Sequence, residues 1–203
     1  QTIKLMQQEK MTIEQVDAIT GPPMGHPKSA SFRTLDMVGL DTFCHVARTC
    51  IEKSTDPVEI EEMQLPDFLD KMVEKKLLGD KTRQGFYKKV RGEAGSEIFA
   101  IDYDTLEYRP REKARFDILK KVKDAGLKDG FKLLVNSDDE VGKFAWNLTK
   151  KLLIYAANRI PEIADDVVNV DRAMSWGFNW ELGPFASWDA IGLRESVGRM
   201  KNE

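Results

Sequence analysis

The side chains of this 203-residue chain that could do acid–base chemistry are few and scattered. Its two histidines are His26, in a proline-rich loop, and His45, which lies beside Cys44 in a helical pattern. A general base must lie within hydrogen-bond reach of the proton it takes, and a third group usually orients it. Neither histidine has an acid at an evident orienting distance. We therefore expect His26 to decorate its loop and His45 to face a helix partner or solvent.

The carboxylates around the same loop are Asp17 and Asp36. A catalytic carboxylate pair would need a nucleophile or a base nearby, and the surrounding residues supply neither. Local roles are the better interpretation, either helix capping or an ion pair with Arg33. Cys44 and Cys50 are six residues apart, about 240° around a helix. They therefore point in different directions, and we expect two buried, reduced thiols rather than a disulfide or a metal site.

The composition excludes several classes of protein. The chain is 41% hydrophobic and 32% charged with a formal net charge of −3, which is typical of a soluble globular protein and not of a nucleic-acid binder. No apolar run approaches the roughly 18 residues of a membrane helix. The first ten residues are too polar for a secretory signal, so we expect a cytoplasmic protein.

Helical patterns cover most of the chain. Thr12 and Gln15 form a capping box that predicts a helix from about Ile13 to Gly21. Gly79 is placed to close a helix that starts near Pro66. Further helices are predicted from residue 32, over 40–51, over 116–125, over 139–160, and after an aspartate cap at 165 or 166. Between 86 and 108 the short segments "GFYKKV", "SEIFAID" and "LEYR" lean towards β-structure, which favours a hairpin or an ordered linker.

An internal repeat links the two ends of the chain. The phrase "DAITGPPMGHPKSASFRTLDMVGLD" (17–41) shares its pattern with "VDRAMSWGFNWELGPFASWDAIGL" (170–193). The matched residues are Phe32, Asp36, Gly39 and Leu40 with Phe185, Asp189, Gly192 and Leu193, each 153 positions later, and Val16-Asp17 with Val170-Asp171. The repeat predicts an all-α fold of two helical bundles, with domains at 1–90 and 113–203 joined by a linker at 91–112.

The first phrase, followed by "EKKLLGDKTRQGFYKK" (74–89), resembles the C-terminal domain of L-3-hydroxyacyl-CoA dehydrogenases. Its wording is most like the long bacterial and archaeal forms fused to an enoyl-CoA hydratase module. The second phrase resembles the same domain. The resemblance implies the helical fold of 6-phosphogluconate dehydrogenase C-terminal domains and an upstream NAD-binding Rossmann domain that carries a His–Glu pair. It also implies oxidation of (3S)-3-hydroxyacyl-CoA to 3-oxoacyl-CoA in fatty-acid β-oxidation, and a possible homodimer.

The chain departs from the family in what it lacks. It contains no G-x-G-x-x-G after a strand, so we expect no NAD site, no metal site and no catalytic residue within it, and we interpret it as an N-terminally truncated piece. The resemblance places the family's asparagine at or near Asn147 in the second copy, as a vestige or a structural residue. Lys28 and Arg33 are the candidates for contact with CoA phosphates. The alternative function is a non-enzymatic helical interaction module that keeps only the fold.

Two further expectations concern apolar residues. Truncation should leave an exposed apolar face near residues 1–20, which includes Ile3, Leu5 and Met6. All four tryptophans fall in the second copy, where a core or interface role is expected and an acyl pocket is the alternative. These residues are Trp146, Trp176, Trp180 and Trp188.

Overall fold

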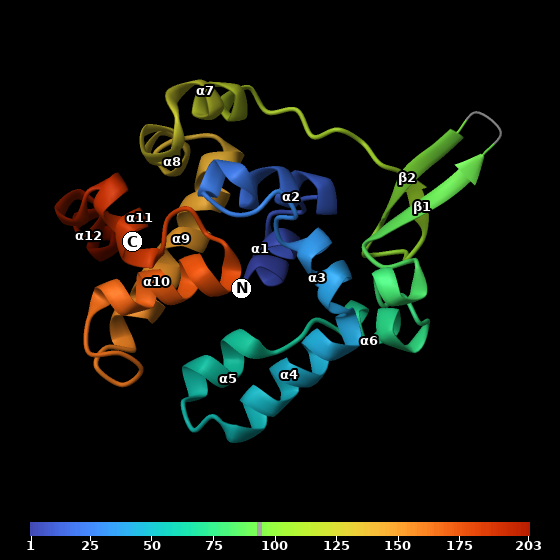
Figure 1. The fold of residues 1–203 in the computed structure, drawn as a ribbon, viewed down its shortest axis with the longest axis horizontal. Coiled ribbons are helices and arrows are strands. Elements are labelled where there is room, and N and C mark those ends of the chain that lie inside the picture. Colours follow the sequence, from blue (N-terminus) through green and yellow to red (C-terminus); the bar gives the residue numbers. More distant parts are fainter. Residues whose placement is uncertain (93–94) are drawn as a thin grey trace. The chain divides into compact units, whose positions relative to one another are not determined.

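The computed structural model describes residues 1–92 and 95–203, and most of them are helical (Figure 1). The chain divides into two compact units. The first contains residues 1–17 and 31–114, and the second contains residues 18–30 and 115–203. The loop that opens the repeated phrase therefore packs with the C-terminal half of the chain, while the helix that follows the loop returns to the first unit.

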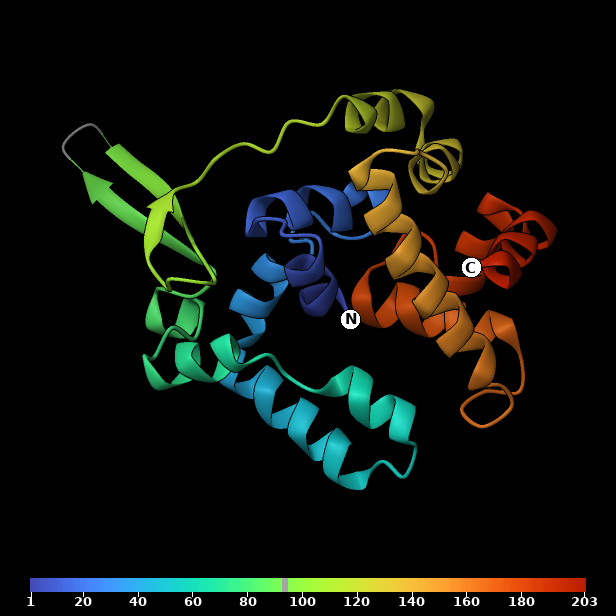
Figure 2. The same cartoon turned by 180° about the vertical axis from the view of Figure 1, so that it is seen from behind.

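Helices α2, α3, α4 and α6 of the first unit start close to the predicted positions, whereas α5 and η2 were not predicted. The capping box is present, because the Thr12 N–H donates to Gln15 Oε1 at 2.8 Å and the Gln15 N–H donates to Thr12 Oγ1 at 3.3 Å. In Figure 2, α4 and α5 run side by side. The helices are α1 (Thr2–Gln8), α2 (Ile13–Thr20, which ends in the second unit), α3 (Phe32–Val38), α4 (Leu40–Lys53), α5 (Pro57–Met63), α6 (Asp67–Glu74) and the 3-10 helix η2 (Asp80–Thr82).

The end of α6 corrects one prediction. Gly79 does not close this helix, because α6 ends at Glu74 and Lys76 takes the left-handed conformation with φ +57°. The Lys76 N–H donates to the Val73 carbonyl and the Leu77 N–H to the Met72 carbonyl, both at 2.9 Å. A lysine thus does what glycine does at many helix ends. Gly79, with φ +98°, is used for a close contact with α3 instead.

Two predictions about burial were wrong. The apolar side chains of α1 are covered, since Ile3, Leu5 and Met6 expose only 8%, 9% and 0% of their surface. No exposed apolar face exists at these three residues. Cys44 is buried as expected, but Cys50 is exposed because it lies on the outer side of α4.

The fold is mostly helical rather than all-α, because the first unit also contains a three-stranded antiparallel sheet. The strands are β1 (Tyr87–Gly92), β2 (Gly95–Ile101) and β3 (Tyr108–Pro110). The predicted hairpin is the β1–β2 pair, with residues 93–94 outside the described residues. The β-leaning segment "LEYR" supplies Tyr108 and Arg109 of β3, but its pairing with β2 was not predicted. Arg109 of β3 donates to both carboxylate oxygens of Glu14 in α2, at 2.7 and 2.9 Å. Burial opposes ionisation of Glu14, but the bonds from Arg109 lower its pKa, so this pair fastens the sheet to the helices of its unit.

The second unit consists of helices. Asp139 and Asp166 cap α9 and α10, each accepting a backbone N–H at 2.8 Å, as predicted. Helix α8 was missed, because Gly130 interrupts its pattern; there α8 packs closely on the Val122 carbonyl of α7. The elements are η1 (Pro22–Met24), α7 (Asp117–Ala125), α8 (Leu127–Val135), α9 (Glu140–Asn158), α10 (Val167–Phe178), α11 (Pro184–Ile191) and α12 (Leu193–Asn202).

The described residues contain no helix that is both long and apolar enough to cross a bilayer. They also contain no group of three or more His, Cys, Asp or Glu side chains placed to hold a metal ion.

Candidate functional site

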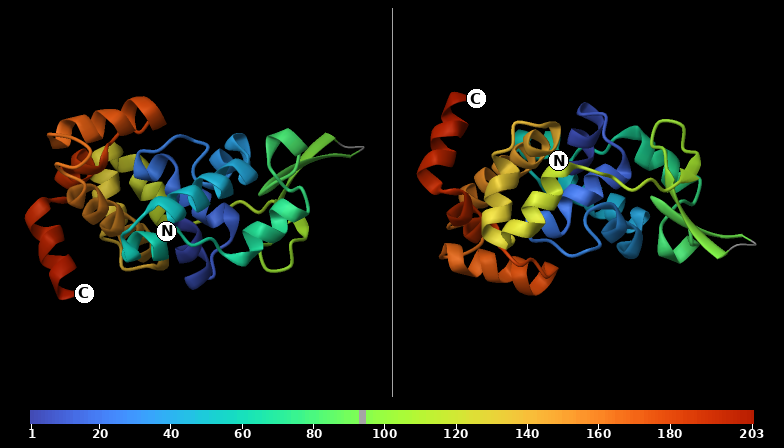
Figure 3. Two further views of the ribbon diagram at one scale, coloured as in Figure 1. Left: turned by 90° about the horizontal axis from the view of Figure 1, so that it is seen from below. Right: turned by 90° about the horizontal axis from the view of Figure 1, so that it is seen from above.

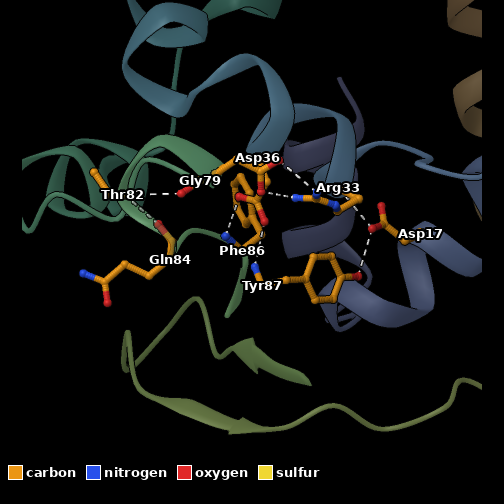
Figure 4. Close-up of polar contacts among 9 residues, drawn as sticks. Asp17, Arg33, Asp36, Gly79, Thr82, Gln84, Phe86 and Tyr87 are labelled. Atoms are coloured by element: carbon orange, nitrogen blue, oxygen red, sulfur yellow. Dashed lines mark hydrogen bonds and ion pairs between the residues drawn. The ribbon is translucent and has the colours of Figure 1, made fainter. Parts of the chain in front are cut away.

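The most organised polar cluster of the first unit surrounds α3 and starts with Asp17 (Figure 4). Its carboxylate accepts the backbone N–H groups of Ser31, Phe32 and Arg33 at 3.1, 2.7 and 3.2 Å. It also accepts the Tyr87 hydroxyl at 2.8 Å. The first N–H groups of a helix have no partner inside the helix and attract negative charge. Asp17 therefore caps α3 from 15 residues away and ties the start of β1 to it.

Asp36, near the other end of α3, holds the segment that leads into the sheet. Its carboxylate accepts the N–H groups of Phe86 and Tyr87, both at 2.8 Å. This differs from the expected cap or Arg33 pair. Two glycines allow the approach: a Cβ on Gly79 would lie 2.2 Å from the Asp36 carbonyl oxygen, and one on Gly85 would lie 2.0 Å from Asp36 Oδ1.

The electrostatics of this cluster suit holding rather than proton transfer. Burial raises the pKa of Asp17 and of Asp36 to about 6, against the lowering effect of the hydrogen bonds that each accepts. Burial, followed by the charge of Asp17, raises the pKa of Tyr87 far above its ordinary value. The oxygens of both carboxylates accept hydrogen bonds from N–H or O–H donors of the same unit. The cluster is therefore a structural clamp on α3, here called the α3 clamp: Asp17, Asp36, Gly79, Gly85 and Tyr87.

The two candidates for phosphate contact fall in different units. Arg33 forms a two-pronged ion pair with Asp80, at 2.5 and 2.9 Å, on the surface of the first unit. Lys28 is exposed and belongs to the second unit. Their contact with a CoA phosphate stays a prediction.

The histidines differ from each other. His26 does not simply decorate its loop: its ring stacks on Trp180 with centroids 4.0 Å apart, and Nδ1 lies 2.9 Å from the Thr20 carbonyl oxygen. Burial lowers its pKa, so the neutral ring is favoured. His45 is exposed on α4, in agreement with one of the two expectations. Neither has a carboxylate partner among the described contacts.

The second unit holds a counterpart of the Asp17 cap. Asp171 of α10 accepts the N–H groups of Phe185 and Ala186 at the start of α11, both at 2.8 Å. A Cβ on Gly183 would lie 2.4 Å from Asp171 Oδ1. A glycine with similar backbone angles then joins each helix pair: Gly39 (φ +98°, ψ 123°) links α3 to α4, and Gly192 (φ +92°, ψ 110°) links α11 to α12.

The remaining candidates of the second unit are dispersed. Asn147 is half-buried on α9. Next to it, Trp146 is 3% exposed and donates its indole N–H to Glu203, whereas Trp176 is 80% exposed and is no core residue. Trp188 donates to Ser196 Oγ at 2.7 Å and Trp180 stacks on His26. An acyl pocket lined by all four tryptophans stays untested.

Sequence reasoning missed the role of the Tyr87 hydroxyl as a donor to Asp17. A buried tyrosine usually gives its O–H a partner, and that rule was the available signal. The partner itself, Asp17, is 70 residues away and no local pattern names it.

The described residues do not fit a nicotinamide dinucleotide. Such a site needs a strand, a glycine-rich turn and a helix N-terminus in sequence, as part of a parallel sheet. The only sheet among the described residues is antiparallel, and β3 is followed by a glycine-free segment. We therefore derive no chemical step through NAD in this chain.

The first part of the chain matches a known protein family. Residues 1–89, which contain the whole α3 clamp, match the family described as 3-hydroxyacyl-CoA dehydrogenase, C-terminal domain. No solved structure shows a significant match to the chain.

Individual relatives extend the likeness over the whole chain. A probable 3-hydroxyacyl-CoA dehydrogenase of Bacillus subtilis is 47% identical over 98% of this chain and 25% of that protein. A putative fatty acid oxidation complex trifunctional enzyme of Rickettsia felis is 27% identical over 87% of this chain and 23% of that protein. A probable 3-hydroxyacyl-CoA dehydrogenase of Deinococcus radiodurans is 38% identical over 47% of this chain and 27% of that protein. The chain thus spans about a quarter of the length of these relatives.

Proposed function

We propose that the chain is the helical, acyl-CoA-side region of an NAD-dependent 3-hydroxyacyl-CoA dehydrogenase. The reaction is oxidation of (3S)-3-hydroxyacyl-CoA to 3-oxoacyl-CoA in fatty-acid β-oxidation, in the cytoplasm. The observation that carries the proposal is the match of residues 1–89 to the C-terminal domain of these enzymes. The 47% identity to the Bacillus subtilis relative across nearly the whole chain supports it.

In this proposal the chain supplies structure and the chemistry lies elsewhere. The α3 clamp fixes α3 and the start of β1, which gives a rigid wall for the acyl chain. Hydride acceptance and proton removal belong to a dinucleotide-binding domain that works with this chain. A hydratase module and a second copy of the enzyme are the further proposed partners.

We also propose that the chain is a tandem duplication, with copies at 1–90 and 113–203 and a linker at 91–112. The matched caps of Asp17 and Asp171 support it, since each carboxylate accepts the N–H of a phenylalanine 15 or 14 residues later. The matched glycines Gly39 and Gly192 support it too, because both occupy a left-handed conformation between two helices. Asn147 would then be the second copy's vestige of the family asparagine.

The experiment uses the Bacillus subtilis relative as the carrier. This chain replaces the matched quarter of that protein, and NADH formation from (3S)-3-hydroxybutyryl-CoA is followed by absorbance. We expect turnover by the chimera and none by the isolated chain, because a lost base alone removes about 10²–10⁴-fold of the rate and the chain holds no hydride acceptor. Micromolar affinity for NAD or turnover by the isolated chain would refute the proposal, and a folded but inactive chimera would favour the interaction module.

A further inference from the structure

The sheet of the first unit carries basic side chains on one face. Cross-strand partners point to the same side of a sheet, and side chains alternate along each strand. Lys89 pairs with Ile98 and Arg91 with Ser96. The Arg111 N–H donates to the Ile98 carbonyl at 2.9 Å, which continues the β2–β3 ladder beyond Pro110. Lys89, Arg91, Ile98 and Arg111 therefore share one face, here called the basic sheet face.

The base of this same face is anchored to the helices of its unit. Tyr87 and Arg109, which share it, reach Asp17 and Glu14. Further along, the hairpin formed by β1 and β2 extends away from the helices of the first unit in both views of Figure 3. The outer part of the basic sheet face is consequently open to solvent, and Lys89, Arg91 and Arg111 are all exposed.

Among its described residues, the basic sheet face carries no acidic side chain. Glu97 pairs with Val90, so it lies on the opposite face. Lys88 also lies there, with its Nζ 5.1 Å from the centre of the Tyr108 ring. Among the described residues, no ion pair is formed by Lys89, Arg91 or Arg111. Lys89 and Arg91 thus stand about 7 Å apart on β1, and Arg111 lies across β2, about 10 Å from Lys89 by strand geometry. Ile98 of β2 lies between Lys89 and Arg111, with 40% of its surface exposed.

We propose that the basic sheet face binds the phosphate groups of the CoA moiety of the substrate. The inference rests on the proposed function, which makes acyl-CoA the substrate. CoA carries a 3′-phosphate on its ribose and a 5′-diphosphate, so its charges are spaced over several ångströms, as the three cations are. Arginine binds phosphate through its fork of N–H donors and lysine through a mobile point charge. Ile98 offers an apolar contact to the adenine ring between them.

The first test measures CoA binding to the isolated chain by calorimetry. The variant carries Lys89→Gln, Arg91→Gln and Arg111→Gln. Exposed charge pairs contribute about 0.2–1 kcal/mol each, so we expect about 10-fold weaker binding. The matched control, Lys120→Gln with Lys121→Gln and Lys123→Gln on α7, removes the same charge from an exposed helix and should bind like the wild type. The wild type and the control should bind dephospho-CoA more weakly than CoA. The variant should bind the two compounds equally.

The second test separates this inference from the proposed function. In the Bacillus subtilis chimera, the triple variant should raise KM for 3-hydroxybutyryl-CoA about 10-fold and leave KM for 3-hydroxybutyryl-pantetheine, which lacks the phosphates, unchanged. If neither substrate is turned over by the parent chimera, the proposed function fails. Normal turnover with an unchanged KM for the CoA substrate overturns this inference alone. The inference is also overturned if the isolated chain binds phosphatidylglycerol vesicles but not CoA, and if the triple variant loses that vesicle binding.

Discussion

Replacing Asp17 by Ala should destabilise the first unit by about 4 kcal/mol. The change leaves three backbone N–H groups at the start of α3 and the Tyr87 hydroxyl without their acceptor. Loss of an N-cap costs up to about 2 kcal/mol, and loss of a hydrogen bond to a buried charged group costs about 1.5–3 kcal/mol. Asp171→Ala loses two N–H acceptor bonds and should cost about 2 kcal/mol in the second unit.

The tryptophans make this comparison measurable unit by unit. All four belong to the second unit, so tryptophan fluorescence in urea reports on that unit, while amide exchange of residues 31–92 reports on the first. Asp17→Ala should raise exchange in the first unit, and Asp171→Ala should lower the fluorescence midpoint. Tyr87→Phe is the control, since it removes one of the four donors and should cost about 1 kcal/mol. If the Asp17→Ala variant showed the amide exchange of the wild type, Asp17 would not stabilise α3 and the α3 clamp would be refuted.

Gly85→Ala should have the second largest effect, about 3 kcal/mol in the first unit. An added Cβ would lie 2.0 Å from Asp36 Oδ1 and 2.6 Å from Gly79 Cα. The backbone of Gly79 cannot move aside as the end of a flexible side chain can, so the 79–86 loop must move away from α3. The Asp36 carboxylate then loses its two N–H donors. The melting temperature of the first unit should fall by about 12 °C.

The matched control makes the same substitution in open space. A Cβ at Gly198, within α12, meets nothing within 4 Å. Alanine in a helix is favoured over glycine by up to about 1 kcal/mol, so Gly198→Ala should leave stability unchanged or raise it. Calorimetry of both variants gives the comparison. Equal melting temperatures would contradict the close packing of the loop on α3.

The sequence allowed the starts of several helices to be predicted, because capping acts over three or four residues. Thr12 with Gln15 marked the start of α2, and Asp166 marked the start of α10. The failure at Gly79 has a physical cause: left-handed backbone is open to lysine as well, and Lys76 used it first. Cys50 was wrongly predicted to be buried, because apolar periodicity shows which residues share a helix face but not whether another element covers that face.

Contacts between residues far apart in the sequence could not be predicted. Asp36 binds Phe86 and Tyr87 across 50 and 51 positions, and Glu14 binds Arg109 across 95. No local pattern pairs such residues, so Asp36 was assigned to capping or to Arg33. The pairing of the third strand was not predicted for a related reason: β3 has only three residues and gains its order from β2.

The proposed function requires that residues 1–89 be what a dehydrogenase needs from this chain, and one measurement tests this requirement most directly. In the Bacillus subtilis chimera, NADH formation from (3S)-3-hydroxybutyryl-CoA is compared with and without residues 1–89, with calorimetric titration of NAD to show that the dinucleotide site remains intact. The account predicts that the deletion keeps NAD binding and abolishes turnover, because the matched domain and its α3 clamp are gone. Turnover that survives the deletion at the parent rate would contradict it.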